Sequence, residues 1–154
     1  QQDPKIRIID EIKITHSGSN VGELMTERMA KIVKDKYPAN EYICYPDPSG
    51  SQRRTSALHT DHHILQSNGF IVKVKKQAPR VIDRLNSVNN DFKTMIIDPR
   101  CRELIKDLEQ VVVKGNTREL DKSNPNLTHL SDALGYFCDY ELPCRKPETK
   151  TFMA

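Results

Sequence analysis

The apolar and polar positions of this chain follow two different periods. At residues 5–14 the sequence K-I-R-I-I-D-E-I-K-I alternates apolar and polar side chains, apart from the Ile8–Ile9 pair. That alternation is typical of a strand with one solvent-facing side. From Val21 to Tyr37 the apolar residues recur at spacings of three and four, which predicts an amphipathic helix that Pro38 ends.

The same two periods continue to the end of the chain. Further strands are expected over Glu41–Tyr45, Phe70–Val74 and Thr94–Ile97. Further helices are expected over Thr60–Asn68, Pro79–Asn90, Arg102–Val113 and from Thr128 to Tyr140. Strands that alternate with helices predict an α/β domain with a largely parallel sheet. We expect this domain to span residues 1–142, followed by a loose tail at 143–154 that is rich in Lys and Pro.

Composition adds few constraints. The chain has 154 residues, 36% of them hydrophobic and 29% charged, which suits one globular domain. No apolar run reaches the roughly 20 residues that a membrane-crossing helix needs. The N-terminus has neither a signal-peptide layout nor an initiator Met, so we expect a cytoplasmic piece of a longer polypeptide. The net charge of +3 is weak support for a polyanionic partner.

The four cysteines, which lack a C-x-x-C pair, argue against a zinc site and for free, mostly buried thiols.

Two acidic residues, Asp47 and Asp132, are candidates for a functional site. Asp47 follows the strand E-Y-I-C-Y and lies between two prolines that fix its backbone. Ligands and catalytic groups collect at the carboxyl ends of parallel strands, although Asp is also a common turn residue. In the last helix, His129, Asp132 and Tyr136 share one stripe, because positions i, i+3 and i+7 line up. Thr128 is expected to be the N-cap of that helix.

These two acids would suit a metal site if the fold brought them together. Two carboxylates at one strand exit repel each other unless a cation compensates them, and oxygen-rich sites suit Mg²⁺ or Mn²⁺. The alternative is that Asp132 is a solvated helix residue and that His129 is part of a neutral helix start.

The order of motifs resembles the nuclease domain of tailed-phage terminase large subunits, which cut and package viral DNA. That family has an Asp after a strand in a D-P-S-like segment, matched here at residues 47–49, and a helix with H-x-x-D-A-x-x-Y, matched by H-L-S-D-A-L-G-Y at residues 129–136. Between them, S-N-G-F-I-V at residues 67–72 resembles the family's helix-to-strand turn. The resemblance covers about Lys5 to Tyr140, and its strength lies in the order of the motifs.

The resemblance implies a ribonuclease H-like fold, a mixed sheet flanked by helices. It implies an endonuclease that cuts concatemeric duplex DNA with two divalent cations, Mg²⁺ or Mn²⁺, held about 4 Å apart by carboxylates. Asp47 and Asp132 would be metal ligands and catalytic residues, with His129 as a further ligand or a residue that orients water. Tyr136 would have a packing or positioning role. The candidates for holding the DNA backbone are the basic residues Arg53, Arg54, Lys73, Lys75 and Lys76. That they are simply solvated surface residues is an equally open alternative.

The resemblance also implies partners and a location. A portal protein and a small terminase subunit would be the protein partners, and the host cell cytoplasm the site of action during virus assembly. The family's ATPase motif G-x-x-x-x-G-K-[ST] does not occur in this sequence.

One departure from the family concerns its first catalytic Asp. In the family that Asp ends a central first strand, upstream of the segment that residues 5–14 resemble. We therefore expect this chain to lack the family's first strands, to fill that position with a second chain or a rearranged sheet, and to cut DNA poorly by itself. Asp10 and Glu11 are acids nearby, but they lie within the predicted strand, where a metal role is not expected.

Two further motifs have simpler interpretations. T-D-H-H at residues 60–63 is similar to a manganese phosphoesterase signature, but Thr60 and Asp61 are expected to cap a helix. D-P-R-C at residues 98–101 is expected to be the turn into the next helix, with a DNA-contacting corner as the alternative.

Two other functions stay open at this point: a non-catalytic docking module of the packaging motor, and another ribonuclease H-like nuclease such as a junction resolvase.

Overall fold

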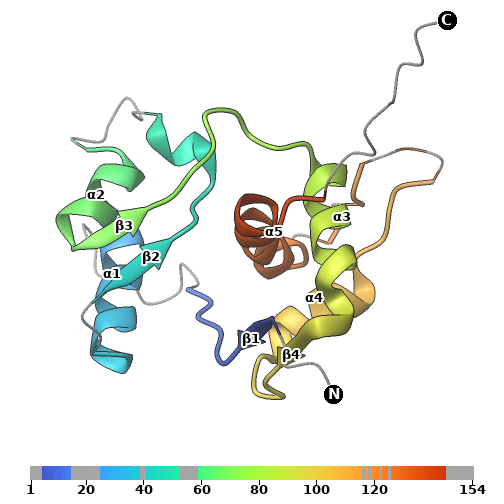
Figure 1. The fold of residues 1–154 in the computed structure, drawn as a ribbon, viewed down its shortest axis with the longest axis horizontal. Helices are drawn as coiled ribbons and strands as arrows, with labels where there is room; N and C mark the ends of the chain where they lie inside the picture. The colour runs from blue at the N-terminus through green and yellow to red at the C-terminus, as the bar shows by residue number, and fades with distance from the viewer. Residues whose placement is uncertain are drawn as a thin grey trace, which may run out of the picture.

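The computed structural model describes residues 5–14, 25–38, 41–52, 59–115, 117, 119–121, 123–124 and 126–144. Within these ranges, the structure contains five α-helices and two pairs of parallel strands (Figure 1), so the predicted α/β class is confirmed. Each predicted helix and strand has a counterpart, and most of the observed elements are shorter than predicted.

The first structural group contains β2, β3, α1 and α2. β2 (Tyr42–Cys44) runs parallel to β3 (Phe70–Val72), with Tyr42 opposite Phe70 and their rings 5.0 Å apart. α1 (Met25–Lys36) and α2 (Asp61–Ser67) pack with this sheet around a core of Ala30, Leu65 and Phe70. α2 ends at a turn in which Gly69 has a φ of 86°, a conformation that favours glycine.

The second group contains β1, β4 and the remaining helices. β1 (Ile6–Ile8) runs parallel to β4 (Met95–Ile97). The helices are α3 (Val81–Asp91), α4 (Arg102–Gln110) and α5 (His129–Glu141). Ile6, Val88 and Cys138 form the core here, with Leu134 and Phe137 of α5 packed against it.

The described strands form two separate two-stranded sheets, β1–β4 and β2–β3, where the sequence predicts one. In Figure 1, α5 is the helix of the second group that faces the first group, with α3 on its other side. A cavity of about 480 Å³ separates β1 from α1 and is lined mostly by apolar residues, among them Ile8, Ile12, Met29, Val33 and Leu134. β1 is also shorter than the predicted strand at residues 5–14, because the chain leaves the sheet after Ile8.

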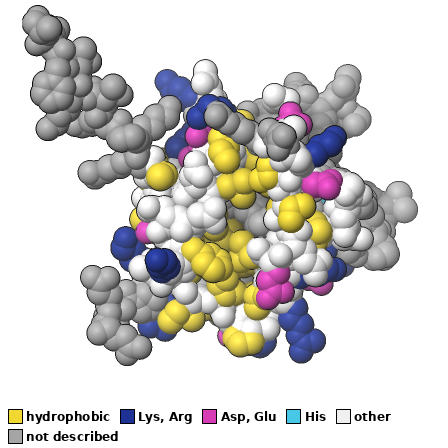
Figure 2. Space-filling model, turned by 90° about the vertical axis from the view of Figure 1, so that its right-hand side faces the viewer, with side chains coloured by type: hydrophobic (Ala, Val, Ile, Leu, Met, Phe, Trp, Pro, Cys, Tyr) yellow, Lys and Arg dark blue, Asp and Glu magenta, His cyan; other side chains and the backbone are white. Residues whose placement is uncertain are grey.

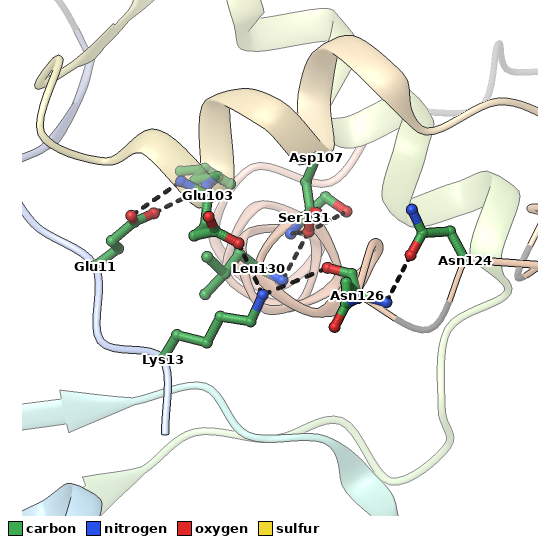
Figure 3. Close-up of polar contacts among 9 residues, drawn as sticks. Glu11, Lys13, Glu103, Asp107, Asn124, Asn126, Leu130 and Ser131 are labelled. Atoms are coloured by element: carbon green, nitrogen blue, oxygen red, sulfur yellow. Dashed lines mark hydrogen bonds and ion pairs between the residues drawn. The ribbon is translucent and has the colours of Figure 1, made fainter. Parts of the chain in front are cut away.

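The residues after β1 instead bind the starts of helices. Glu11 accepts hydrogen bonds from the backbone N–H groups of Glu103 (3.0 Å) and Leu104 (2.8 Å), and so caps α4 (Figure 3). Asp107 of α4 in turn accepts from the N–H groups of Leu130 (3.0 Å) and Ser131 (3.1 Å), and so caps α5. These contacts fix the start of the helix that carries Asp132.

The surface is mixed in character. Figure 2 shows the face that lies at the right in Figure 1, with apolar side chains near its centre and charged side chains mostly around them. Several large apolar side chains are exposed, including Ile9, Phe92 and Val112. No helix in the described parts of the chain combines the length and the apolar character needed to cross a bilayer.

The four cysteines are free thiols, as predicted, although only Cys101 and Cys138 are fully buried.

Candidate functional site

Asp47 lies at the exit of β2, where the sequence predicts it. Its Oδ1 accepts a hydrogen bond from the Ser49 N–H (2.8 Å) and so caps the short 3-10 helix η1 (Pro48–Ser51). Pro46 and Pro48 hold the backbone on either side. Asp47 therefore fills the turn role that is usual for Asp, and its second carboxylate oxygen remains available for other contacts.

The backbone of Asp47 is held by a histidine. His62 Nε2 lies 2.9 Å from the carbonyl oxygen of Asp47. A carbonyl only accepts, so Nε2 carries the proton. His62 is buried against Gly50. A side chain at position 50 would collide with the imidazole ring, because a Cβ there would stand 2.9 Å from it, so the glycine makes room for His62. His62 thus fixes the turn that carries Asp47.

The capping interpretation of T-D-H-H is confirmed. The Thr60 hydroxyl accepts from the His63 N–H (3.2 Å) at the start of α2. Asp61 stands in the first turn and accepts from the Thr26 hydroxyl of α1 (2.7 Å). The motif therefore starts a helix and joins it to α1, while its His62 also holds the loop of Asp47.

Asp132 lies in the first turn of α5 and forms an ion pair. Its Oδ1 accepts from Arg84 Nη2 of α3 at 2.9 Å. Arg84 is only 7% exposed, and Gly135 allows its stem to lie close to α5, because a Cβ there would be 3.2 Å from Arg84 Cβ. Asp132 is therefore a partly buried, paired residue and not a solvated one.

Tyr136 joins the two acids into one cluster. Its hydroxyl donates to Asp47 Oδ2 at 2.7 Å, and its ring centroid lies 4.3 Å from the guanidinium carbon of Arg84. Asp47, Tyr136, Arg84 and Asp132 thus form a continuous cluster, which we call the acid–arginine cluster. It connects the end of β2 with α3 and α5.

The titration properties of this cluster follow from its contacts. Burial, together with the hydrogen bond to Asp47, raises the pKa of Tyr136 to about 12. Burial acts to raise the pKa of Asp47, but the hydrogen bonds from Tyr136 and Ser49 outweigh it and lower that pKa. Asp47 is therefore ionised and Tyr136 neutral across the physiological range.

The donors of the cluster fit a divalent cation in part. Among the described residues, no group of three or more His, Cys, Asp or Glu is placed to hold a metal ion. Asp47 and Asp132 offer two carboxylates, however, and Mg²⁺ is commonly bound by one or two carboxylates with water and substrate phosphates. In this structure the compensating charge beside Asp132 is the guanidinium of Arg84.

The other residues singled out from the sequence lie around this cluster. His129 is exposed at the first residue of α5, one turn before Asp132. Lys73 pairs with Glu141 (2.9 Å) and Lys75 with Asp139 (2.5 Å), and both lysines line a small pocket together with Tyr136. Lys76 is exposed next to them. Arg53 and Arg54 lie outside the described residues.

The remaining acids have structural partners. Asp98 accepts from the N–H of Arg100 (2.9 Å) in the turn between β4 and α4, which confirms the turn interpretation of D-P-R-C. Asp10 binds Tyr37 and Lys36 of α1, and Glu11 caps α4. Both acids therefore serve contacts with helices, Asp10 with α1 and Glu11 with α4.

Two residues of the site have no counterpart in the sequence predictions. Arg84 stands in a stripe of α3 that is buried despite its polarity, with Ser87, Val88 and Asp91 at helical spacing. The only signal in the sequence for a buried Arg84 is that it shares one face of the helix with Val88. His62 belongs to a motif that capping explains.

No protein-family model, curated protein or solved structure matches this chain.

Proposed function

We propose that this chain is a metal-dependent DNA endonuclease domain of the terminase large-subunit type, with a ribonuclease H-like fold. One observation carries the proposal: Asp47 at a strand exit and Asp132 on the last helix, far apart in sequence, are linked through Tyr136 and Arg84 in the acid–arginine cluster. The resemblance of D-P-S and H-L-S-D-A-L-G-Y to the family's motifs supports the assignment.

In this proposal Asp47 and Asp132 hold Mg²⁺ or Mn²⁺. When bound, such cations supply Lewis acidity, both for activating water and for neutralising the phosphate under attack. Two cations need donors beyond these two carboxylates. Substrate phosphate oxygens, water and His129, one turn before Asp132, are the candidates. Tyr136 fixes the orientation of Asp47 through the hydrogen bond to Oδ2.

Duplex DNA is the proposed substrate, bound through its backbone. Lys73 and Lys75 line a pocket beside Tyr136, and Lys76 follows them. Glu141, which pairs with Lys73, is partly exposed, so phosphates would compete with it for the ammonium group. Asp139, which pairs with Lys75, is buried, so Lys75 would bind a phosphate while keeping this ion pair. Such contacts position DNA without reading its sequence. A portal and a small terminase subunit in the host cytoplasm are the proposed partners.

Calorimetric titration with Mn²⁺ tests the metal site directly. We expect the wild-type chain to bind Mn²⁺ with millimolar or tighter affinity, and Asp132→Asn to lose that binding, because the amide lacks the charge that a hard cation needs. Asp98→Asn is the matched control, since Asp98 also follows a strand and pairs with an arginine, yet lies outside the cluster. Equal Mn²⁺ binding by wild type and Asp132→Asn would contradict the proposal.

A non-catalytic docking module is the second candidate. The Arg84–Asp132 ion pair favours it, because the guanidinium compensates Asp132 without any metal. This candidate predicts that the wild-type chain binds no divalent cation and does not nick supercoiled plasmid in Mn²⁺. A junction resolvase would instead nick branched DNA in preference to linear duplex.

A further inference from the structure

Two consecutive helices of the second group lack a capping bond from their own N-cap residue. Cys101 precedes α4 and Thr128 precedes α5, and neither side chain accepts a hydrogen bond from the helix that follows it. Each helix is capped instead by a carboxylate from elsewhere in the chain, α4 by Glu11 and α5 by Asp107. The free N–H groups at a helix start need such acceptors, so each start depends on the segment that supplies its carboxylate.

The two caps are connected in series through α4. Glu11 binds the N–H groups of Glu103 (3.0 Å) and Leu104 (2.8 Å), and Asp107 follows them by one turn of the same helix (Figure 3). Residues three and four apart lie on one face of a helix, so the turn that receives the first cap stands next to the residue that supplies the second. A disturbed first turn of α4 therefore displaces Asp107, which is only 3% exposed and has little room to adjust.

Residues 10–13, which we call the strap, connect both helix starts with α1. Lys13 Nζ donates to the Glu103 carboxylate (2.8 Å) and to the carbonyl oxygen of Asn126 (3.5 Å), which lies just before α5. At the other end of the strap, Asp10 is bound by side chains at the end of α1. The strap thus joins the first structural group to the start of the last helix.

We propose that the strap and α4 form a conformational relay that controls the order of the first turn of α5. Release of Glu11 frays the start of α4, weakens the Asp107 cap and so loosens residues 129–132, although Glu11 itself binds α4. Asp132 then loses its fixed position opposite Arg84. The relay is a property of the fold and does not depend on the proposed metal site.

Amide hydrogen exchange of the full chain, followed by NMR, tests the relay in the variant Glu11→Gln. The uncharged amide weakens the cap of α4, so the N–H groups of Glu103 and Leu104 should exchange about fivefold faster, the factor expected for the loss of one helix cap. The relay predicts that the N–H groups of Leu130 and Ser131, which Asp107 binds, also exchange at least about twofold faster.

Glu109→Gln is the matched control, because Glu109 is an exposed acid of the same helix. It should leave the exchange rates at both helix starts as they are in the wild type. Faster exchange at the start of α4 alone in Glu11→Gln would overturn the relay, since the two caps would then act independently. Unchanged exchange at both starts would also overturn it, since Glu11 would then not hold α4.

The wild-type chain supplies a second test if Glu11→Gln does not fold. Exchange is measured at low urea concentrations, where N–H groups that open together respond to urea with the same slope. The relay predicts one shared slope for Leu104 and Leu130, smaller than that of Val88 in the core, which opens only when the whole protein unfolds. Two different slopes, or a shared slope equal to that of Val88, would overturn the inference.

Discussion

At the scale of single residues, Tyr136 and Asp47 fix each other's protonation state. Burial is the larger cause of the raised pKa of Tyr136, and the 2.7 Å hydrogen bond to Asp47 adds to it. Burial acts in the opposite sense on Asp47, but this bond, together with the bond from Ser49, outweighs it and lowers the pKa of Asp47. For a raised pKa, the contribution of Tyr136 to stability is present below pH 10 and is lost as the pH rises through about 12. For Asp47 the contribution is present above its ordinary pKa and is lost on acidification.

The variant Asp47→Asn tests this coupling. We expect the pKa of Tyr136 to fall below about 12 but to remain above its ordinary value of 10, because burial is the larger cause and persists in the variant. The measurement is an NMR titration of the Tyr136 ring carbon next to the hydroxyl. Asp98→Asn should leave the titration as it is in the wild type. An unchanged midpoint in Asp47→Asn would show that the hydrogen bond does not set the pKa.

Sequence spacing finds some of these residues and misses others for a physical reason. Asp132 and Tyr136 are four residues apart on one helix, so helix geometry alone places them together. Asp47 is found because the carboxyl ends of strands are where parallel sheets gather ligands. Arg84 and His62 act through contacts with residues far along the chain, and no local pattern encodes such a contact.

At the scale of elements, the N-terminus of α5 is capped by an acidic side chain of another helix. Thr128 is the N-cap residue, as predicted, but it has a φ of 80° and its side chain makes no capping hydrogen bond. Asp107 of α4 supplies the acceptor instead, through Oδ2. A sequence pattern for capping looks only at neighbouring residues, so it predicts the right position and the wrong acceptor.

Asp107→Asn should therefore destabilise the protein. Asp107 is only 3% exposed and caps two N–H groups, and the neutral amide both weakens these bonds and buries an extra donor. We expect a loss of about 1–3 kcal/mol in the free energy of unfolding, measured by urea denaturation followed by circular dichroism. Glu109→Gln, an exposed change on the same helix, should cost less than about 0.5 kcal/mol. Equal effects of the two changes would argue against the cap.

Element boundaries show the same limit of local patterns. The alternation at residues 5–14 suits a long strand, yet only Ile6–Ile8 pairs with β4. Asp10 and Glu11 lie beyond the paired residues, where their carboxylates bind the Lys36–Tyr37 pair and the start of α4 and so hold the chain away from the sheet. Tertiary contacts with charged groups thus end a strand that the pattern alone would continue.

At the scale of the whole molecule, the sequence predicts the class of fold but not the arrangement of its sheets. Alternating strands and helices correctly indicate parallel pairing, since each described strand pair is parallel. Which strands are neighbours depends on contacts between distant segments, and the structure separates β1–β4 from β2–β3. α5 and the loop after β2 are in contact across the two groups, through Tyr136 with Asp47 and through Tyr45 with Glu141 and Phe137.

Tyr45 is the centre of that contact. Its ring meets Phe137 at 5.1 Å and Tyr140 at 5.5 Å, both edge-on, and its hydroxyl donates to Glu141 at 2.5 Å. Edge-to-face aromatic pairs add to the energy of burial, so this residue joins the β2 loop to α5 more firmly than the surface ion pairs around it.

We expect Tyr45→Ala to lower the free energy of unfolding by about 2–3 kcal/mol, because it removes both ring contacts and leaves a cavity between the groups. Tyr45→Phe keeps the rings and removes only the exposed hydrogen bond to Glu141, so it should cost less than about 1 kcal/mol. Urea denaturation measures both variants. If Tyr45→Ala costs no more than Tyr45→Phe, the rings do not hold the groups together, and the contact with α5 depends instead on the hydrogen bond of Tyr136 to Asp47 and on the ion pairs of Lys73 and Lys75.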